Sequence, residues 1–170
     1  MNRARDIAKV ALLCTIAVGC GSGGGTLADG GDPRDTGATP GGGTLIWREG
    51  GTMHTALYPA AAIARSSQLD FLQISGGDAG VGISFGVAIQ PPPLVAGAYA
   101  CGGTGYPIVS FTYTTADGLA QTCGVDLSAI GFVSGAHVVG TFSASIATSA
   151  GASKAITEGH FDIAATVSTL

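Results

Sequence analysis

The chain has 170 residues, a formal net charge of -4 and only 11% charged residues. Nucleic-acid backbones are bound by clustered Lys and Arg side chains. The four basic residues beyond position 20, which are Arg34, Arg48, Arg65 and Lys154, form no stripe, so nucleic acid is excluded as a partner. The 29 glycines supply little volume for a core, so the interior depends on few large side chains.

The first 19 residues are typical of an export signal. Three basic residues are followed by the apolar run 10–18 (VALLCTIAV) and by the small residues of Ala17-Val18-Gly19. This run is far shorter than the roughly 20 residues of a membrane-spanning helix. We therefore expect residues 1–19 to be removed after export and exclude them from the fold.

Cys20 directly follows the small residues and resembles the cysteine of the bacterial lipobox. This resemblance implies that Cys20 is lipidated and becomes the new N-terminus, with acyl chains that hold the protein on a membrane. Position 21 is Gly rather than Asp, which favours the outer membrane or cell surface over inner-membrane retention. An ordinary secretory signal with an incidental cysteine is the alternative.

Residues 20–43 read as the lipidated cysteine and a flexible tether. Gly, Pro, Thr and Asp dominate this segment and large apolar side chains are almost absent, so it cannot bury enough surface to fold. The folded domain is expected at 44–170. Two cysteines remain there, Cys101 and Cys123, and an even pair in an oxidising compartment predicts a disulfide.

From Thr44 onward, short segments of alternating polarity predict an all-β domain, an antiparallel two-sheet β-sandwich of about nine strands. Turns are expected at Gly76-Gly77-Asp78 and Ala116-Asp117-Gly118, and Pro91-Pro92-Pro93 should be a loop or an edge. Segment 59–66 is ambiguous between a helical turn and a strand. The clearest strands are residues 69–74, 81–89, 108–114, 123–130, 137–146 and 155–167.

The alternation also predicts which side chains fill the core. In the expected C-terminal hairpin, Phe161 and Ile163 share a face with Gly159, while His160 and Asp162 point the opposite way. The full predicted core is Leu45, Trp47, Leu57, Leu69, Leu72, Ile74, Phe85, Val87, Tyr99, Phe111, Val125, Phe142, Phe161 and Ile163.

Four short motifs follow each other in the C-terminal half: Gly97-Ala98-Tyr99, Gly124-Val125-Asp126-Leu127, Gly140-Thr141-Phe142-Ser143 and the run 156–163 (ITEGHFDI). In this layout the chain resembles a family of lipid-anchored or secreted bacterial β-sandwich domains of unknown function. The motifs consist of turn glycines and core aromatics. The resemblance therefore implies a fold and a location rather than a reaction.

Three side chains invite a hydrolase hypothesis, because Ser143, His160 and Asp162 are expected to face solvent on neighbouring strands. However, His160 and Asp162 alternate along one strand about 7 Å apart, so the carboxylate is poorly placed to orient the imidazole. No nucleophile elbow surrounds Ser143. We therefore expect no catalytic residues and a non-enzymatic protein.

The sequence also predicts no metal site and no cofactor. His54, His137 and His160 come from three separate segments without HxH or HExxH spacing. Asp78, Asp117 and Asp126 offer oxygen ligands for calcium, but their spacing matches no known calcium loop. Turn formation explains these residues more simply.

We therefore expect a lipid-anchored cell-envelope protein whose sandwich is a structural or interaction module, bound to the membrane through Cys20 and contacting envelope proteins or glycans. The alternative function is carbohydrate binding at the cell surface. It rests on the aromatic side chains Trp47, Tyr58 and Tyr106 as a ligand face, although Trp47 fits a core position equally well.

Overall fold

The structure, a computed structural model, describes residues 42–113, 120–147 and 152–170. Strands account for 71% of these residues and none of them is helical, so the predicted all-β class is confirmed. Cys20, the predicted signal, the predicted tether up to residue 41, and Asp117 lie outside the described residues. Gly43, predicted as the last residue of the tether, is instead the first residue of strand β1.

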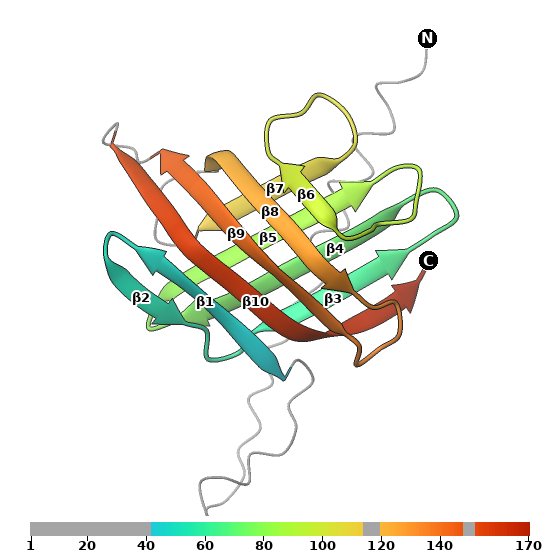
Figure 1. Cartoon of the computed structure of the whole chain (residues 1–170), viewed down its shortest axis with the longest axis horizontal. Coiled ribbons are helices and arrows are strands. Elements are labelled where there is room, and N and C mark those ends of the chain that lie inside the picture. Colours follow the sequence, from blue (N-terminus) through green and yellow to red (C-terminus); the bar gives the residue numbers. More distant parts are fainter. Residues whose placement is uncertain (1–41, 114–119, 148–151) are drawn as a thin grey trace, which may run out of the picture. The chain divides into compact units, whose positions relative to one another are not determined.

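Ten strands make up one sheet (Figure 1). Its order is β6-β8-β9-β10-β3-β4-β5-β7, with β1 attached to β10 and β2 attached to β1. The strands are β1 (Gly43–Glu49), β2 (Thr52–Thr55), β3 (Ala60–Arg65), β4 (Asp70–Asp78), β5 (Val81–Ile89), β6 (Gly97–Ala100), β7 (Ile108–Tyr113), β8 (Ala120–Ile130), β9 (His137–Ala147) and β10 (Ser153–Thr169).

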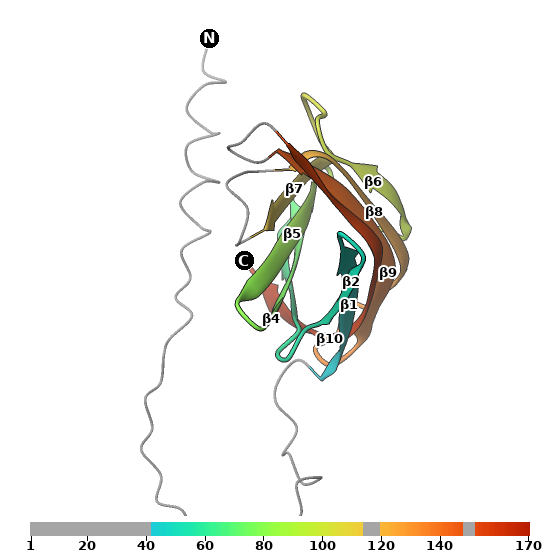
Figure 2. The same cartoon turned by 90° about the vertical axis from the view of Figure 1, so that its left-hand side faces the viewer.

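Strand β10 joins the two halves of the sheet. Its first part lies between β9 and β1 in antiparallel pairing, and residues 165–169 then pair in parallel with β3. The sheet therefore curls back on itself and nearly closes into a barrel, as Figure 2 shows. The two-sheet sandwich that the sequence predicts is not confirmed, because this 17-residue strand belongs to both halves.

The predicted strands are largely confirmed. β5 has the predicted bounds, β9 and β10 form the predicted hairpin, and the ambiguous segment 59–66 contains strand β3. The turn predicted at Gly76-Gly77-Asp78 was wrong, because these residues still pair with β5. The chain turns instead at Ala79 and Gly80, whose φ angles are 45° and 88°. Two successive positive φ values suit the twist of a tight hairpin.

A cluster of four phenylalanines fills the interior. Phe85 and Phe111 come from β5 and β7, while Phe142 and Phe161 come from β9 and β10. The ring centroid of Phe85 lies 4.8 Å from that of Phe142 and 5.5 Å from that of Phe161. Aromatic pairs at these distances add to the stabilisation that burial provides. This four-phenylalanine cluster therefore holds the two halves of the sheet together.

Twelve of the 14 predicted core residues are buried, and Leu57 and Leu69 are the exceptions. Leu57 is 67% exposed, so its prediction as core was wrong. It lies in the β2–β3 connection, where its N–H donates to the carbonyl of Gly77, and the backbone rather than the side chain makes the contact. Leu69 is half-buried in the turn before β4.

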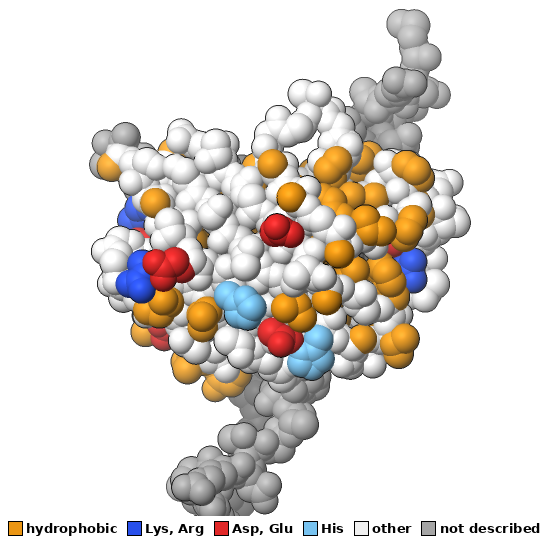
Figure 3. All heavy atoms as spheres, in the orientation of Figure 1, with side chains coloured by type: hydrophobic (Ala, Val, Ile, Leu, Met, Phe, Trp, Pro, Cys, Tyr) orange, Lys and Arg blue, Asp and Glu red, His pale blue; other side chains and the backbone are white. Residues whose placement is uncertain are grey.

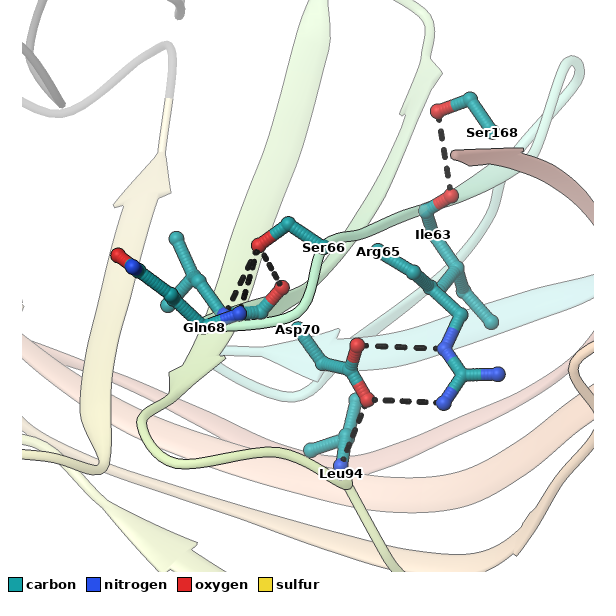
Figure 4. A network of polar contacts seen from close by, with 8 residues as sticks. Ile63, Arg65, Ser66, Gln68, Asp70, Leu94 and Ser168 are labelled. Atoms are coloured by element: carbon teal, nitrogen blue, oxygen red, sulfur yellow. Dashed lines mark hydrogen bonds and ion pairs between the residues drawn. The ribbon is translucent and has the colours of Figure 1, made fainter. Parts of the chain in front are cut away.

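One end of the barrel is closed by an ion pair and a loop (Figure 4). Asp70, the buried first residue of β4, accepts hydrogen bonds from the Arg65 guanidinium and from the backbone N–H of Leu94. Leu94 belongs to the loop that contains the three predicted loop prolines, and its side chain is fully buried. The carboxylate therefore fixes this loop over the core, because a buried charge needs such partners.

Gly140 and Gly159 lie within β9 and β10, inside the strands predicted at 137–146 and 155–167. A Cβ on Gly140 would lie 2.2 Å from the carbonyl oxygen of Asp126 and 2.6 Å from the Phe161 ring. A Cβ on Gly159 would lie 2.4 Å from the carbonyl oxygen of Phe142. Both glycines are needed because neighbouring strands and rings occupy the space of a side chain.

We predict that Gly140→Ala lowers the free energy of unfolding by about 3 kcal/mol, because the added methyl group must displace the backbone of β8 or the Phe161 ring. Gly124→Ala is the matched control, since its Cβ would meet only the Ser143 hydroxyl, at 3.8 Å. Urea unfolding of both variants measures the difference. Equal unfolding midpoints for the two variants would contradict this packing.

Candidate functional site

A candidate binding site lies on the outer face of the sheet, within the described residues. The outward-facing residues of β6, β8, β9 and β10 line an open depression with a volume of about 530 Å³, which we call the outer depression. In Figure 3 this face is mostly backbone and small polar side chains. The side chains that line it are Ala98, Ala100, Asp126, Thr141, Ser143 and Glu158, and Gly124 forms part of its floor.

The small side chains create the outer depression, and two carboxylates give it charge. Asp126 and Glu158 line it, and no Lys or Arg does. Glu158 lies in a bulge of β10 and also pairs with Arg48 at 3.0 Å. The hydroxyls of Thr141 and Ser143 donate or accept hydrogen bonds. The surface therefore suits a ligand or partner that presents hydrogen-bond donors or positive charge.

The predicted disulfide is present and fixes one wall of this site. Cys101 directly follows the four-residue strand β6 and is bonded to Cys123 in β8. The N–H of Cys101 also donates to the carbonyl of Cys123 at 3.0 Å. Among the described strands, β6 pairs with β8 alone. The disulfide therefore holds this short edge strand in place.

We predict that replacing Cys101 and Cys123 by serine lowers the free energy of unfolding by about 3 kcal/mol, since the bond closes a loop of 22 residues. Denaturant unfolding of the oxidised protein and of the double variant measures the loss. Hydrogen exchange should rise most at β6. An unchanged stability would show that β6 does not depend on the bond.

The three residues of the hydrolase hypothesis do not assemble into a triad. His160 and Asp162 face outward on β10 as predicted, and Ser143 faces outward on β9. Asp162, however, forms its hydrogen bond with His137 on β9 and not with His160. A carboxylate that pairs with a different histidine does not orient His160 toward a serine.

Five polar side chains gather at the end of the barrel opposite to Asp70, and sequence reasoning, which considered His54 and Asp78 separately, did not predict that they come together. This acidic rim consists of Glu49, His54, Asp78, Tyr113 and Lys154. The Glu49 carboxylate accepts a hydrogen bond from the Tyr113 hydroxyl at 2.6 Å and pairs with Lys154 at 2.7 Å. His54 contacts Asp78 at 3.1 Å. The alternation of Leu45, Trp47 and Glu49 along β1 was the signal that places Glu49 on the inner face.

The hydrogen bonds within the acidic rim change the acidity of Glu49. Its contact with Lys154 and its hydrogen bond from Tyr113 hold the pKa of the carboxyl below its usual value of 4.5. Glu49 therefore stabilises the fold in its ionised form. A depressed carboxylate pKa means that this stabilisation is complete above pH 4.5 and is lost as the pH falls through the lowered pKa.

We predict that Glu49→Gln is less stable than the unmodified chain at neutral pH, and that the difference narrows as the pH falls below 4.5. Urea unfolding across a pH series measures both effects. Glu158→Gln is the control, because an exposed ion pair contributes little. If the difference in the free energy of unfolding between Glu49→Gln and the unmodified chain stays constant down to acidic pH, the role of the Glu49 carboxylate is disproved.

The residues considered for metal binding are separated. Asp78 contacts His54 in the acidic rim, whereas Asp126 lies on the outer face. His137 and His160 lie on the outer face, where Figure 3 shows two histidines with an acidic side chain between them. Within the described ranges, no three His, Cys, Asp or Glu residues form a group that could hold a metal ion.

The three aromatic residues of the predicted ligand face are also not brought together. Trp47 is fully buried, where its ring stacks on His54 at 5.2 Å, so its assignment to an exposed ligand face is corrected. Tyr58 precedes β3, and the first residue of β3 pairs with Ser75 near the end of β4. Tyr106 precedes β7, which begins opposite the end of β5. The antiparallel register of β4 and β5 therefore separates the two tyrosines.

Comparisons of the chain with protein-family models, with curated protein sequences and with solved structures found no match. The described segments contain no helix with the length and apolar character needed to cross a bilayer.

Proposed function

We propose that the protein is a lipid-anchored, non-enzymatic interaction module of the bacterial envelope, and that it binds its partner at the outer depression. The observation that carries this proposal is a depression built from strand residues, with one wall held by the Cys101–Cys123 bond. Side chains on strands keep a binding surface rigid, so binding costs little ordering entropy. The export signal and Cys20 in the sequence supply the proposed location.

The chemistry of the outer depression favours a protein segment with basic or amide groups as the partner. Asp126 and Glu158 provide acceptors, and the floor at Gly124 lets a chain approach the backbone closely. The pairing of Asp162 with His137 also supports a non-enzymatic role, since it withdraws the carboxylate from His160. The resemblance to lipid-anchored β-sandwich domains agrees with this proposal. That resemblance and the two-sheet sandwich architecture both stay predictions.

Carbohydrate binding is the second candidate function. Asp126, Thr141 and Ser143 offer the hydrogen-bonding groups that a sugar needs, and the exposed Tyr106 lies in the loop that continues from β6. Trp47 no longer supports this candidate, because its ring is buried. A glycan ligand would therefore rely on hydrogen bonds more than on stacking.

A bulky residue at the floor of the depression tests both candidates. Gly124→Trp should fill the site without strain, because only Ser143 lies near a Cβ at this position. Ala62→Trp on the exposed side of β3 adds the same side chain on the other half of the sheet and serves as the control. Both variants are compared with the unmodified chain in an envelope pull-down and on a glycan array.

We predict that the unmodified chain recovers one envelope protein in the pull-down. The recovered amount should fall at least tenfold with Gly124→Trp and stay unchanged with Ala62→Trp. Sugar binding that Gly124→Trp abolishes would instead support the carbohydrate candidate. Equal binding by both variants would show that the outer depression is not the site.

The anchor is tested separately. We predict that labelling with a fatty-acid analogue marks the chain in its native host, and that Cys20→Ala abolishes the label and releases the protein from the membrane fraction. Retention of the Cys20→Ala variant in the membrane fraction without label would contradict the proposed anchor.

A further inference from the structure

Glu158, which lines the outer depression, has a backbone conformation that is unfavourable for its residue type. Its φ angle is 51°, in the left-handed region, where a Cβ atom crowds the following carbonyl oxygen. Glycine has no Cβ and is the usual residue where a bulged strand takes this conformation. The backbone at position 158 therefore favours glycine over glutamate.

A bulge in β10 produces this conformation. The register between β9 and β10 shifts between Ile156 and Gly159, so Thr157 and Glu158 together take the place of one residue. An extra residue of this kind changes the direction in which a strand presents its side chains. At this bulge the Glu158 side chain lines the outer depression and is 58% exposed.

Contacts within the protein do not explain a glutamate at this position. Glu158 Oε1 lies 3.0 Å from Arg48 Nε, but the Arg48 side chain is also 35% exposed, and an exposed ion pair adds little to stability. The Glu158 side chain is too exposed to contribute to the core. A strained residue that brings no gain in stability is typical of a functional site.

Arg48 fixes the direction of the Glu158 carboxylate. The Nη1 atom of Arg48 donates a hydrogen bond to the carbonyl of Gly51 in the β1–β2 turn at 2.8 Å, so the guanidinium is itself held. Its contact with Glu158 involves one carboxylate oxygen, and a carboxylate accepts hydrogen bonds at both oxygens. The carboxylate is therefore positioned and can still accept from a ligand.

The surroundings of Glu158 determine which ligand group it can bind. Gly124 pairs with Ser143 and Asp126 pairs with Thr141 across β8 and β9, so β9 lies between the carboxylates of Asp126 and Glu158. None of the residues that line the outer depression is Lys or Arg. Ammonium and guanidinium groups form strong hydrogen bonds with carboxylates, so the site suits a basic side chain.

We infer that Glu158 is the specificity-determining residue of the outer depression and that it selects a partner segment with a lysine or arginine side chain. This inference rests on the proposed binding function of the outer depression. It also gives the left-handed backbone a role, because the bulge directs the carboxylate into the site. The chain gives up stability at position 158 in exchange for this contact.

The test measures peptide binding to the full-length Cys20→Ser protein by fluorescence anisotropy. The probe is a short fluorescent peptide of alternating lysine and serine residues, and a second peptide carries norleucine in place of each lysine. Glu158→Gln removes the charge and keeps the length of the side chain. Asp162→Asn is the matched control, because it removes the same charge from the outer face but outside the outer depression.

We predict that the protein binds the lysine peptide about tenfold more tightly than the norleucine peptide, the effect of one hydrogen bond between charged groups. Glu158→Gln should remove this preference and Asp162→Asn should keep it. Equal binding of the two peptides, no binding of either, or an equal loss with both variants would overturn the inferred role of Glu158.

Glu158→Gly tests the backbone argument separately. Its urea unfolding midpoint should be at least as high as that of the Cys20→Ser protein, although it loses the preference for lysine. Ala79→Gly is the control, because Ala79 has a φ angle of 45° in the β4–β5 turn, and this variant should keep the preference. A lower midpoint for Glu158→Gly would show that the fold requires the glutamate and would contradict the inference.

Failure of the proposed function gives a different result. If Gly124→Trp binds the lysine peptide as tightly as the protein with Gly124, the outer depression is not the binding site. If Gly124→Trp loses the peptide while Glu158→Gln keeps the preference for lysine, the outer depression is the site and the inference about Glu158 alone is wrong.

Discussion

The packing of four phenylalanine rings between the two halves of the sheet is the constraint on which the rest of the structure depends. Phe85 meets both Phe142 and Phe161, so rings from β5, β9 and β10 share one interior. Large apolar side chains are few in this glycine-rich chain, and each ring contributes a large part of the buried apolar area. The close approach of Gly140 and Gly159 to these rings follows directly.

Because side chains fill the interior of the barrel, we expect a binding site on its outer surface. One end is closed by the Asp70 ion pair and Leu94, and the other holds the Glu49 hydrogen bonds. The outer depression is a described surface whose lining side chains are held on strands, and the disulfide between Cys101, next to β6, and Cys123 in β8 supports one of its walls.

Period-two alternation was enough to predict the all-β class, most strands and most of the core. Each strand buries one face, and a shift of one residue would expose its apolar side chains. The disulfide was also predictable, because Cys101 and Cys123 are the two cysteines within the predicted domain 44–170. The displaced turn at Ala79 and Gly80 shows the limit of composition, since Gly76 and Gly77 resemble turn residues yet stay paired with β5.

Features that depend on which strands pair with each other could not be predicted from the sequence. The sequence of β10 is that of an ordinary strand, and nothing in it indicates antiparallel neighbours for one part and a parallel neighbour for residues 165–169. The outer depression combines residues from four strands, so it exists only after they pair. The acidic rim was partly predictable, because Glu49 continues the inward alternation of β1, but its contacts with Tyr113 and Lys154 join distant segments.

The account is tested most directly by nuclear Overhauser contacts between the phenylalanine side chains of the Cys20→Ser protein. Cross-peaks from the Phe85 ring to both the Phe142 and Phe161 rings are expected, because these centroids lie 4.8 Å and 5.5 Å apart. If the Phe85 ring showed contacts only within its own half of the sheet, or if it proved accessible to solvent, the nearly closed barrel and the surfaces assigned to it would be contradicted.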